Sequence, residues 1–238
     1  MSDKYPSMRA LYADPLNVEG TTYGKRWKRH EWIQLVEAQA TDNPKTEKVV
    51  LAIHGGGIEG GTSEVALAVA GLHPATFAQA TDGRGFHDLW IFEGLLSSGN
   101  SDLHVTSTEY DDPIALEIVQ NARRCISLHG FCDDTATANK KCQIGGLDKE
   151  LKSILLDELT ALEIPALIAV GTKLGGSDPF NICNRTKSGA GVQLELEKTF
   201  RESLFAPNCF TRELRKNNTN ADFDKLVLGL RTALSRVN

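Results

Sequence analysis

The sequence lacks the features of a membrane protein or a nucleic-acid-binding protein. No apolar run among its 238 residues approaches the roughly 20 residues that a membrane-spanning helix needs. Lysine and arginine number 26 against 31 aspartates and glutamates, so the net charge of −5 offers no basic surplus for phosphates. We therefore expect neither membrane nor nucleic acid as a partner.

Signs of secretion are also missing. The opening stretch "MSDKYPSMRALYADPLNVEG" has no apolar signal-peptide core, which predicts a cytoplasmic protein with lysis as its route of release. The five cysteines are an odd number without metal-finger spacing, so we expect reduced thiols rather than disulfides. We also expect a monomer.

Two known motifs, one catalytic and one phosphate-binding, are incomplete around the glycine-rich stretch "HGGGIEGGT" (54–62). An HGGG-type serine esterase needs a G-x-S-x-G segment and a histidine near the C-terminus, but the sequence has no G-x-S-x-G and no histidine after His129. A phosphate-binding P-loop needs a lysine where Gly61 or Thr62 stands. Both motifs are excluded.

A dinucleotide-binding loop is disfavoured for a different reason. Gly55, Gly57 and Gly60 satisfy G-x-G-x-x-G. However, the acid expected about 20 residues later could only be Asp82, and the segment before it does not resemble a strand. Glu59 would also repel a pyrophosphate.

Segments typical of buried strands alternate with amphipathic helical segments. Residues 49–53 form a continuous apolar run, as expected of a strand buried on both faces. This alternation predicts an α/β sandwich of one domain around a mixed, largely parallel sheet. Further strands are predicted at residues 87–95, 103–108, 124–130, 165–171 and 191–197, and helices at residues 113–121, 147–162 and 223–237, with a surface loop at residues 211–224.

Three side chains suggest a metal site at the carboxyl edge of this sheet. His54 and His129 each stand at the end of a predicted strand and before a glycine. The glycines between His54 and Glu59 let the loop fold back, so that both side chains can converge on one ion. A catalytic zinc takes three such ligands and leaves one position open. We therefore predict His54, Glu59 and His129 as metal ligands.

The sequence resembles the phage-type poly-γ-glutamate hydrolases. The resemblance rests on "AIHGGGIEGGTSE" (52–64), "LHVTST" (103–108), "SLHG" (127–130) and "NICNRTKSGAGVQLEL" (181–196), which occur in the family's order. It implies a three-layer sandwich like that of the zinc carboxypeptidases, with Zn²⁺ as cofactor. Residues 46–238 would form the hydrolase domain and residues 1–45 an N-terminal extension at its edge.

The family's substrate is a chain of glutamates joined through their side-chain carboxyls, each with a free α-carboxylate. An acidic enzyme needs local cations to bind it, and Arg185 is suited to clamp a carboxylate with two parallel hydrogen bonds. We expect Asn184 to donate beside it and His104, in "LHVTST", to contact substrate. One departure concerns Glu109, which stands where many relatives have a histidine.

Glu195, in "GVQLELE" (191–197), is the predicted catalytic residue. It follows a glycine-rich loop and matches in order the glutamate that zinc carboxypeptidases place opposite the metal on a late strand. Such a base takes a proton from the attacking water and passes it to the leaving amine. By contrast, Glu197 is expected on the solvated face of an edge strand.

The resemblance thus predicts a zinc-dependent amide hydrolase that cleaves γ-glutamyl bonds. Two alternatives stay open on the sequence alone. One is a zinc amidase or peptidase for another acyl-amino acid or peptide. The other is a binder of acidic polymers without catalysis, although a pure binder has no need of a full ligand set together with a base.

Overall fold

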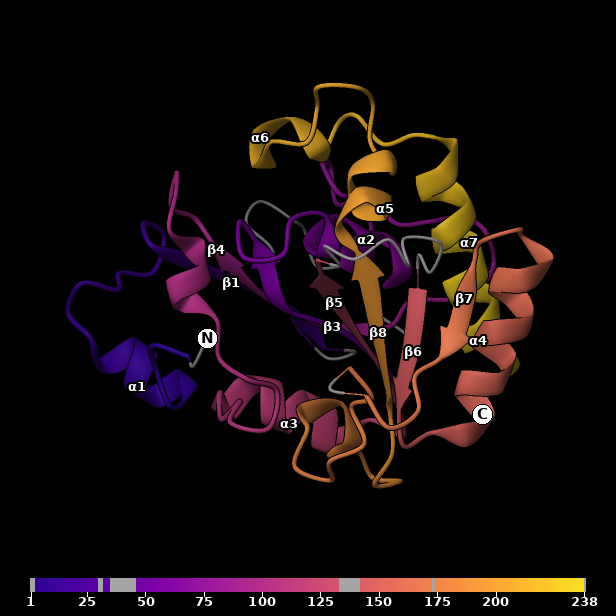
Figure 1. Ribbon diagram of the computed structural model, residues 1–238, viewed down its shortest axis with the longest axis horizontal. Helices are drawn as coiled ribbons and strands as arrows, with labels where there is room; N and C mark the ends of the chain where they lie inside the picture. The colour runs from indigo at the N-terminus through magenta and orange to yellow at the C-terminus, as the bar shows by residue number, and fades with distance from the viewer. Residues whose placement is uncertain (1–2, 30–31, 35–45, 133–141, 173, 238) are drawn as a thin grey trace.

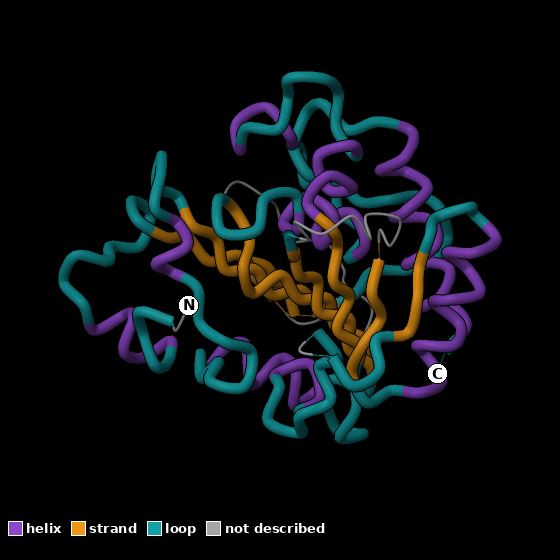
Figure 2. The backbone as a smooth tube through the Cα atoms, viewed as in Figure 1, coloured by secondary structure: helices purple, strands orange, loops and turns teal. Residues whose placement is uncertain are grey.

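The computed structural model describes residues 3–29, 32–34, 46–132, 142–172 and 174–237. Within them, eight strands form one sheet in the order β2-β1-β4-β3-β5-β8-β6-β7 (Figures 1 and 2). The strands are β1 (Tyr23–Arg29), β2 (Trp32–Gln34), β3 (Lys48–Gly56), β4 (Asp88–Gly94), β5 (Arg124–Phe131), β6 (Cys142–Gly146), β7 (Ala166–Ile168) and β8 (Val192–Glu197). Residues 1–45, predicted as an N-terminal extension, thus contribute β1 and β2 at one side of this sheet.

The centre of the sheet is parallel and its flanks are antiparallel. Strands β4, β3, β5 and β8 run in the same direction, whereas β1 is antiparallel to β4 and β6 is antiparallel to β8. The predicted mixed, largely parallel α/β fold is confirmed. Because the carboxyl ends of parallel strands meet at one edge, the four central strands place their last residues side by side.

Helices cover both faces of the sheet and give three layers. Figure 1 shows α2 and α7 on one side and α1 and α3 on the other. Val50 and Ala52 of β3 pack in the core beneath α2, α4 and α7, whereas Val49 and Leu51 pack in the core beneath α1 and α3. The helices are α1 (Met8–Ala13), α2 (Thr62–Val69), α3 (Pro113–Asn121), α4 (Lys149–Ala161), α5 (Lys198–Ser203), α6 (Arg212–Arg215) and α7 (Ala221–Arg236), with short 3₁₀ turns η1 (Asn100–Leu103) and η2 (Ile182–Asn184).

One predicted strand is wrong. Leu103 ends η1, and residues 104–108 continue as irregular chain that does not join the sheet. Side chains, rather than a neighbouring strand, bind this backbone: the Val105 carbonyl accepts from His54 Nε2 at 2.9 Å, and the Thr106 amide donates to the Asp3 carboxylate at 2.6 Å. Backbone groups that have such partners do not need the hydrogen bonds of a neighbouring strand.

Two expectations about exposure are also wrong. Strand β8 lies inside the sheet, between β5 and β6, and all six of its residues are buried. Glu197 is not solvated, because its carboxylate caps α5 by accepting from the Phe200 amide at 3.0 Å. The predicted loop at residues 211–224 contains α6 and the start of α7, and the side chain of Arg215 is buried.

No helix in the described part of the chain is long and apolar enough to cross a membrane.

Candidate active site

Three of the predicted site residues meet at the carboxyl edge of the central strands. His54 is near the end of β3, His129 near the end of β5 and Glu195 on β8. His129 and Glu195 are direct partners in the parallel pairing of β5 with β8. All three side chains are buried, with relative exposures of 2%, 3% and 5%. The sheet topology therefore concentrates ionisable groups in one protected place.

The glycine-rich loop folds back and joins Glu59 to His54. The Glu59 amide donates to the His54 carbonyl at 2.8 Å, and Glu59 Oε1 lies 3.1 Å from His54 Nδ1. Gly56 makes this turn with a φ of +65°, and a Cβ at that position would lie 2.4 Å from the Gly94 carbonyl oxygen. Only glycine fits there. The other carboxylate oxygen, Glu59 Oε2, accepts from the Gly130 amide at 2.8 Å.

The Nδ1 atoms of the His54 and His129 imidazole rings face each other. His54 Nε2 donates to the Val105 carbonyl at 2.9 Å, which leaves the lone pair of the neutral ring on Nδ1. His129 Nε2 is hydrogen-bonded to Ser127 Oγ at 2.9 Å, and its Nδ1 lies 3.2 Å from His54 Nδ1. When His129 Nε2 donates to Ser127, the lone pairs of both Nδ1 atoms and the Glu59 carboxylate converge, and a proton or a cation must stand between them.

The spacing of these atoms fits a tetrahedral zinc ion. Ligand bonds of about 2.0–2.1 Å place neighbouring ligand atoms roughly 3.3 Å apart in a tetrahedron. His54 Nδ1 lies 3.2 Å from His129 Nδ1 and 3.1 Å from Glu59 Oε1, both close to this value, whereas the 3.9 Å separation of His129 Nδ1 is to the other carboxylate oxygen, Glu59 Oε2. Neutral imidazole and carboxylate are also the donors that zinc prefers.

His104 belongs to the same cluster. Its ring stacks on that of His54 with centroids 3.9 Å apart, and its Nε2 lies 4.0 Å from Glu59 Oε1. One ligand atom from each of His54, Glu59 and His104 lies within 4.8 Å of the other two. His104 Nδ1 donates to Asp3 Oδ1 at 2.7 Å, so that the lone pair of its neutral ring is on Nε2. The structure thus gives His104 the orientation of a ligand or of a proton carrier beside the metal position.

The protonation states suit a cation site. Burial would raise the pKa of Glu59, but the charge and hydrogen bond of His54 outweigh it and lower that pKa to about 2. Burial lowers the pKa of His129 to about 3, which keeps the ring neutral. Burial would also lower the pKa of His54, yet Glu59 raises it above its ordinary value. The proton that this shift favours occupies the position that a metal ion would take.

Glu195 faces the cluster and is held by a chain of amides. Gln193 Nε2 donates to Glu195 Oε1 at 2.8 Å, and Asn181 Nδ2 donates to Gln193 Oε1 at 2.7 Å. Burial raises the pKa of Glu195 to about 8, and the negative charge of Glu59 adds to this rise while His54 opposes it. The pKa of Glu195 therefore depends on the charges of the candidate ligands Glu59 and His54.

Besides His104, two residues were predicted to bind substrate, and they differ in their surroundings. Asn184 is buried and its side chain is used inside its own loop, since Nδ2 donates to the carbonyls of Gly176 and Asp178 at 2.8 and 2.9 Å and Oδ1 accepts from backbone amides. Within the described chain, no hydrogen bond or ion pair engages the Arg185 guanidinium. Substrate binding by Arg185 stays a prediction.

Asp3, Lys4 and Arg201 contribute to the site, although no motif in the sequence identified them as site residues. Asp3 orients His104, and both line a cavity of about 370 Å³ together with Lys4 and Glu59. Arg201 of α5 is buried and donates to the carbonyls of Leu196 at 3.1 Å and Gly60 at 2.6 Å. It therefore ties the glycine loop to β8. Asp3 and Lys4 are far in the sequence from Glu59 and His104, and Arg201 is far from the Gly60 that it binds, so spacing could not reveal these contacts.

The sequence is similar to a protein family and to proteins of Bacillus subtilis. Residues 30–228 match the model of a family described as poly-gamma-glutamate hydrolase. The UPF0714 protein YndL of Bacillus subtilis (strain 168) is 39% identical over 158 residues, which are 66% of this chain and 56% of that protein. The SPbeta prophage-derived UPF0714 protein YoqZ of the same strain is 35% identical over 176 residues, or 74% and 57%. The chain thus spans little more than half the length of these relatives.

Two solved structures resemble the whole fold. One is described as a bacteriophage poly-gamma-glutamate hydrolase, with a TM-score of 0.79, 31% sequence identity and coverage of 98% of this chain and 96% of that one. The other is described as zinc-free YndL in its apo form, with a TM-score of 0.79, 31% identity and coverage of 99% and 98%.

Proposed function

This chain belongs to the poly-gamma-glutamate hydrolase family, and on that premise we propose that it hydrolyses γ-glutamyl amide bonds with a zinc ion held by His54, Glu59 and His129. The observation that supports the proposal is the convergence of two imidazole nitrogens and a carboxylate, with His54 Nδ1 3.2 Å from His129 Nδ1 and 3.1 Å from Glu59 Oε1. The description of one related structure as zinc-free supports zinc as the metal. His104 would then lie beside the ion, on the side open to substrate.

Zinc bound there would polarise the scissile carbonyl, acidify the attacking water and favour the ionised form of Glu195. The side chains around the ion would transfer the proton. Glu195 takes the proton of the attacking water on its carboxylate and releases it to the leaving amine nitrogen, a role worth typically 10²- to 10⁴-fold in rate. Gln193 holds Glu195 Oε1 and so leaves Oε2 for this proton. His54 and His129, both buried, keep bulk water away from the exchange.

Cations near the site would select an acidic polymer. The protein has a net charge of −5, so attraction for a polyanion must come from local groups. Lys4 lines the cavity beside Glu59 and His104, and its only ion pair among the described residues is an exposed one with Asp102 at 3.6 Å. The Arg185 guanidinium makes no hydrogen bond or ion pair with the described residues. Each could bind an α-carboxylate of the polymer.

A substrate panel with matched metal controls tests the proposal. The zinc-loaded protein should shorten poly-γ-glutamate on a gel and leave α-linked polyglutamate intact. A chelator should stop the reaction and added zinc should restore it. Cleavage that continues in His54→Ala without bound metal would refute the metal reading, and retardation of the polymer without shortening would indicate a binder. Hydrolysis of acyl-amino acids alone would redirect the proposal to another zinc amidase.

A further inference from the structure

Arg201 of α5 contacts the residue that follows each of three candidate site residues. Its Nε donates to the carbonyl of Leu196 at 3.1 Å, and its Nη1 donates to the carbonyl of Gly60 at 2.6 Å. Its guanidinium also lies against Gly130. These three contacts come directly after site residues in the sequence, namely Glu195, Glu59 and His129. One side chain therefore touches all three segments that carry the site.

The contact with Gly130 depends on the absence of a side chain there. A Cβ at this position would lie 2.5 Å from the central carbon of the guanidinium, so a larger residue would push the guanidinium away from its two carbonyls. The Gly130 amide donates to Glu59 Oε2 at 2.8 Å, and Gly130 pairs with Leu196 in the sheet. Arg201 therefore packs on the backbone group that orients the Glu59 carboxylate.

The charge of Arg201 is buried at this edge of the sheet, with a relative exposure of 6%. Burial lowers the pKa of its guanidinium, and the negative charges of Glu59, Glu197 and Glu202 oppose this decrease. An arginine stays protonated in proteins, so the buried charge persists. A buried charge is costly unless it is paired and hydrogen-bonded. Here the backbone of the site segments and the charge of Glu59 supply that compensation.

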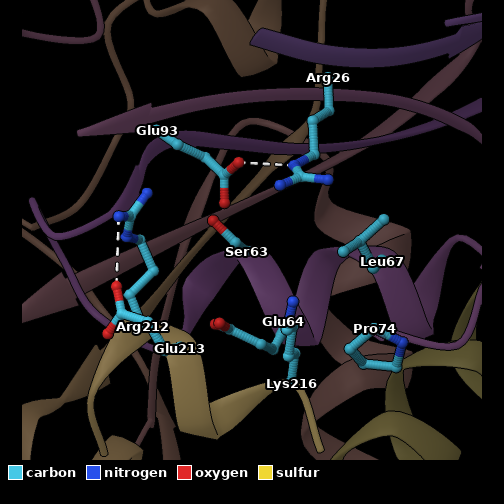
Figure 3. A pocket seen from close by; sticks show the side chains of 9 residues that line it. All are labelled: Arg26, Ser63, Glu64, Leu67, Pro74, Glu93, Arg212, Glu213 and Lys216. Atoms are coloured by element: carbon cyan, nitrogen blue, oxygen red, sulfur yellow. Dashed lines mark hydrogen bonds and ion pairs between the residues drawn. The ribbon is translucent and has the colours of Figure 1, made fainter. Parts of the chain in front are cut away.

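The start of the glycine-rich loop is held by other side chains. The Gly56 amide donates to Ser63 Oγ at 2.9 Å, and the Gly56 carbonyl accepts from Arg215 Nη2 at 2.8 Å. Figure 3 shows the Ser63 side chain extending from α2 toward the sheet. Different groups thus anchor the two ends of the loop, and Arg201 holds the end at Gly60. Loss of Arg201 should release that end and leave the start of the loop in place.

We propose that Arg201 is a positioning residue, which sets the separation of Glu59, His129 and Glu195 by holding the backbone that follows each of them. The role rests on the proposed function, because the zinc ligands and the base are assigned there. Without the guanidinium the three segments could shift relative to one another, so that zinc would bind less tightly and Glu195 would meet the attacking water less often. A lysine offers a point charge instead of a planar fork and cannot reproduce this geometry.

The first test measures zinc affinity by competition with a chelator. Arg201→Ala should bind zinc about 10- to 100-fold more weakly than the parent, as is typical when an outer support of a metal ligand is lost. Arg201→Lys should recover only part of this affinity. Guanidinium ion, added far below denaturing concentrations, should restore zinc affinity and kcat to Arg201→Ala, whereas ammonium ion at the same concentration should not.

A second measurement uses the zinc-free protein. The Gly130 amide should exchange its hydrogen faster in Arg201→Ala than in the parent, relative to the other amides of β5, because its bond to Glu59 opens more often. The control is Arg231→Ala, which removes another buried arginine, one that donates to the carbonyls of Val69 and Gly85 at 3.0 and 2.9 Å. This variant should have a lower Tm, but its zinc affinity, kcat and relative Gly130 exchange should match those of the parent.

Zinc affinity in the Arg201 variants equal to that of Arg231→Ala would overturn the proposal, and so would equal rescue by ammonium and guanidinium. If Arg201→Ala does not fold, the same measurements on Arg201→Lys decide. Failure of both variants to fold would make Arg201 a determinant of the fold and would also overturn the proposal. The proposed function fails separately, if the parent protein binds no zinc or leaves poly-γ-glutamate intact. In that case Gly130 exchange still shows whether Arg201 holds these segments together.

Discussion

The Nδ1 atoms of His54 and His129 lie 3.2 Å apart, with the Nε2 atom of each ring held by another protein group. Neither Nδ1 can satisfy the other unless a proton or a cation stands between them. His104 Nε2 lies 4.0 Å from Glu59, nearly as close as His129 Nδ1 at 3.9 Å, but the His104 side chain is 34% exposed against 3% for His129. This geometry favours His129 over His104 as the third zinc ligand, after His54 and Glu59.

We therefore expect His129→Ala to lose zinc far more completely than His104→Ala. Removing His129 should lower zinc affinity by more than about 100-fold, beyond the roughly 10- to 100-fold typical when an outer partner of a metal ligand is lost. Competition with a chromogenic chelator measures both variants. His73→Ala, an exposed histidine outside the site, is the control. Equal loss in the His104 and His129 variants would make His104 a ligand of the same rank.

Glu195→Gln should separate catalysis from binding. The amide keeps the shape of the side chain but cannot accept the proton of the attacking water, so kcat should fall by about two orders of magnitude or more. Zinc content and KM should stay close to those of the parent. Glu202→Gln, an exposed change on α5, should leave kcat unaltered. A Glu195→Gln enzyme with nearly normal kcat would remove Glu195 from the mechanism.

The stability of the zinc-free protein should fall as the pH rises through the neutral range. Folding raises the pKa of Glu195 from 4.5 to about 8, chiefly by burial. The folded state therefore binds a proton that the unfolded state has released, and this contribution is complete below pH 4.5 and is lost as the pH approaches 8. Thermal unfolding should show a Tm that declines between about pH 6.5 and 8, because below pH 6.5 the lowered pKa of the buried His129 makes stability rise with pH and opposes the effect of Glu195.

Glu195→Gln removes this titration, so its Tm should change less over the same interval. The difference between the two curves isolates Glu195 from other groups that titrate there. Parallel curves would show that the carboxyl group of Glu195 is not buried in a way that raises its pKa.

Asp3→Asn should weaken the site through His104. The Asp3 carboxylate accepts from His104 Nδ1 at 2.7 Å and from the Thr106 amide at 2.6 Å, which fixes both the tautomer and the loop. Loss of such an outer carboxylate typically costs about 10- to 100-fold in metal affinity or activity. Asp102→Asn is a matched control, since Asp102 lines the same cavity but pairs with Lys4 instead.

The readout that distinguishes orientation from mere folding is the pH–rate profile. In Asp3→Asn the acidic limb of kcat/KM should shift, because the carboxylate no longer favours one tautomer of His104, while the Tm changes little. An unchanged pH–rate profile together with a lowered Tm would show that Asp3 only stabilises the fold.

Arg185→Ala should raise KM for poly-γ-glutamate and leave kcat and zinc content near normal. A charge-assisted bond to a carboxylate contributes about 1.5–3 kcal/mol, so an increase in KM of roughly tenfold or more is expected. Arg185→Lys should recover only part of it, since lysine cannot form two parallel bonds. Lys187→Ala, which loses only an exposed pair with Glu47 at 3.8 Å, serves as control. Equal KM values for the Arg185 and Lys187 variants would contradict a clamp at Arg185.

Much of this site could be predicted from local sequence. His54 and Glu59 are five residues apart, and the glycines between them permit only a short, tight return, so their meeting follows from the chain itself. The apolar runs that became β3, β4 and β5 are strong signals because a strand buried on both faces tolerates few polar residues. The histidines at the ends of β3 and β5 therefore had to share an edge once those strands ran parallel.

Other features were decided only when distant segments packed together. The alternating pattern of β8 is typical of a half-exposed strand, yet the order of strands placed it between β5 and β6, where Glu195 and Glu197 are buried and hydrogen-bonded. Strand order depends on how helices and strands fill a common core, which no short stretch encodes. The bond between Asp3 and His104 joins residues 101 positions apart, and that between Arg201 and Gly60 spans 141. Sequence determined which groups could do the chemistry, and tertiary packing decided which of them face one another, because contact between remote side chains depends on the whole fold.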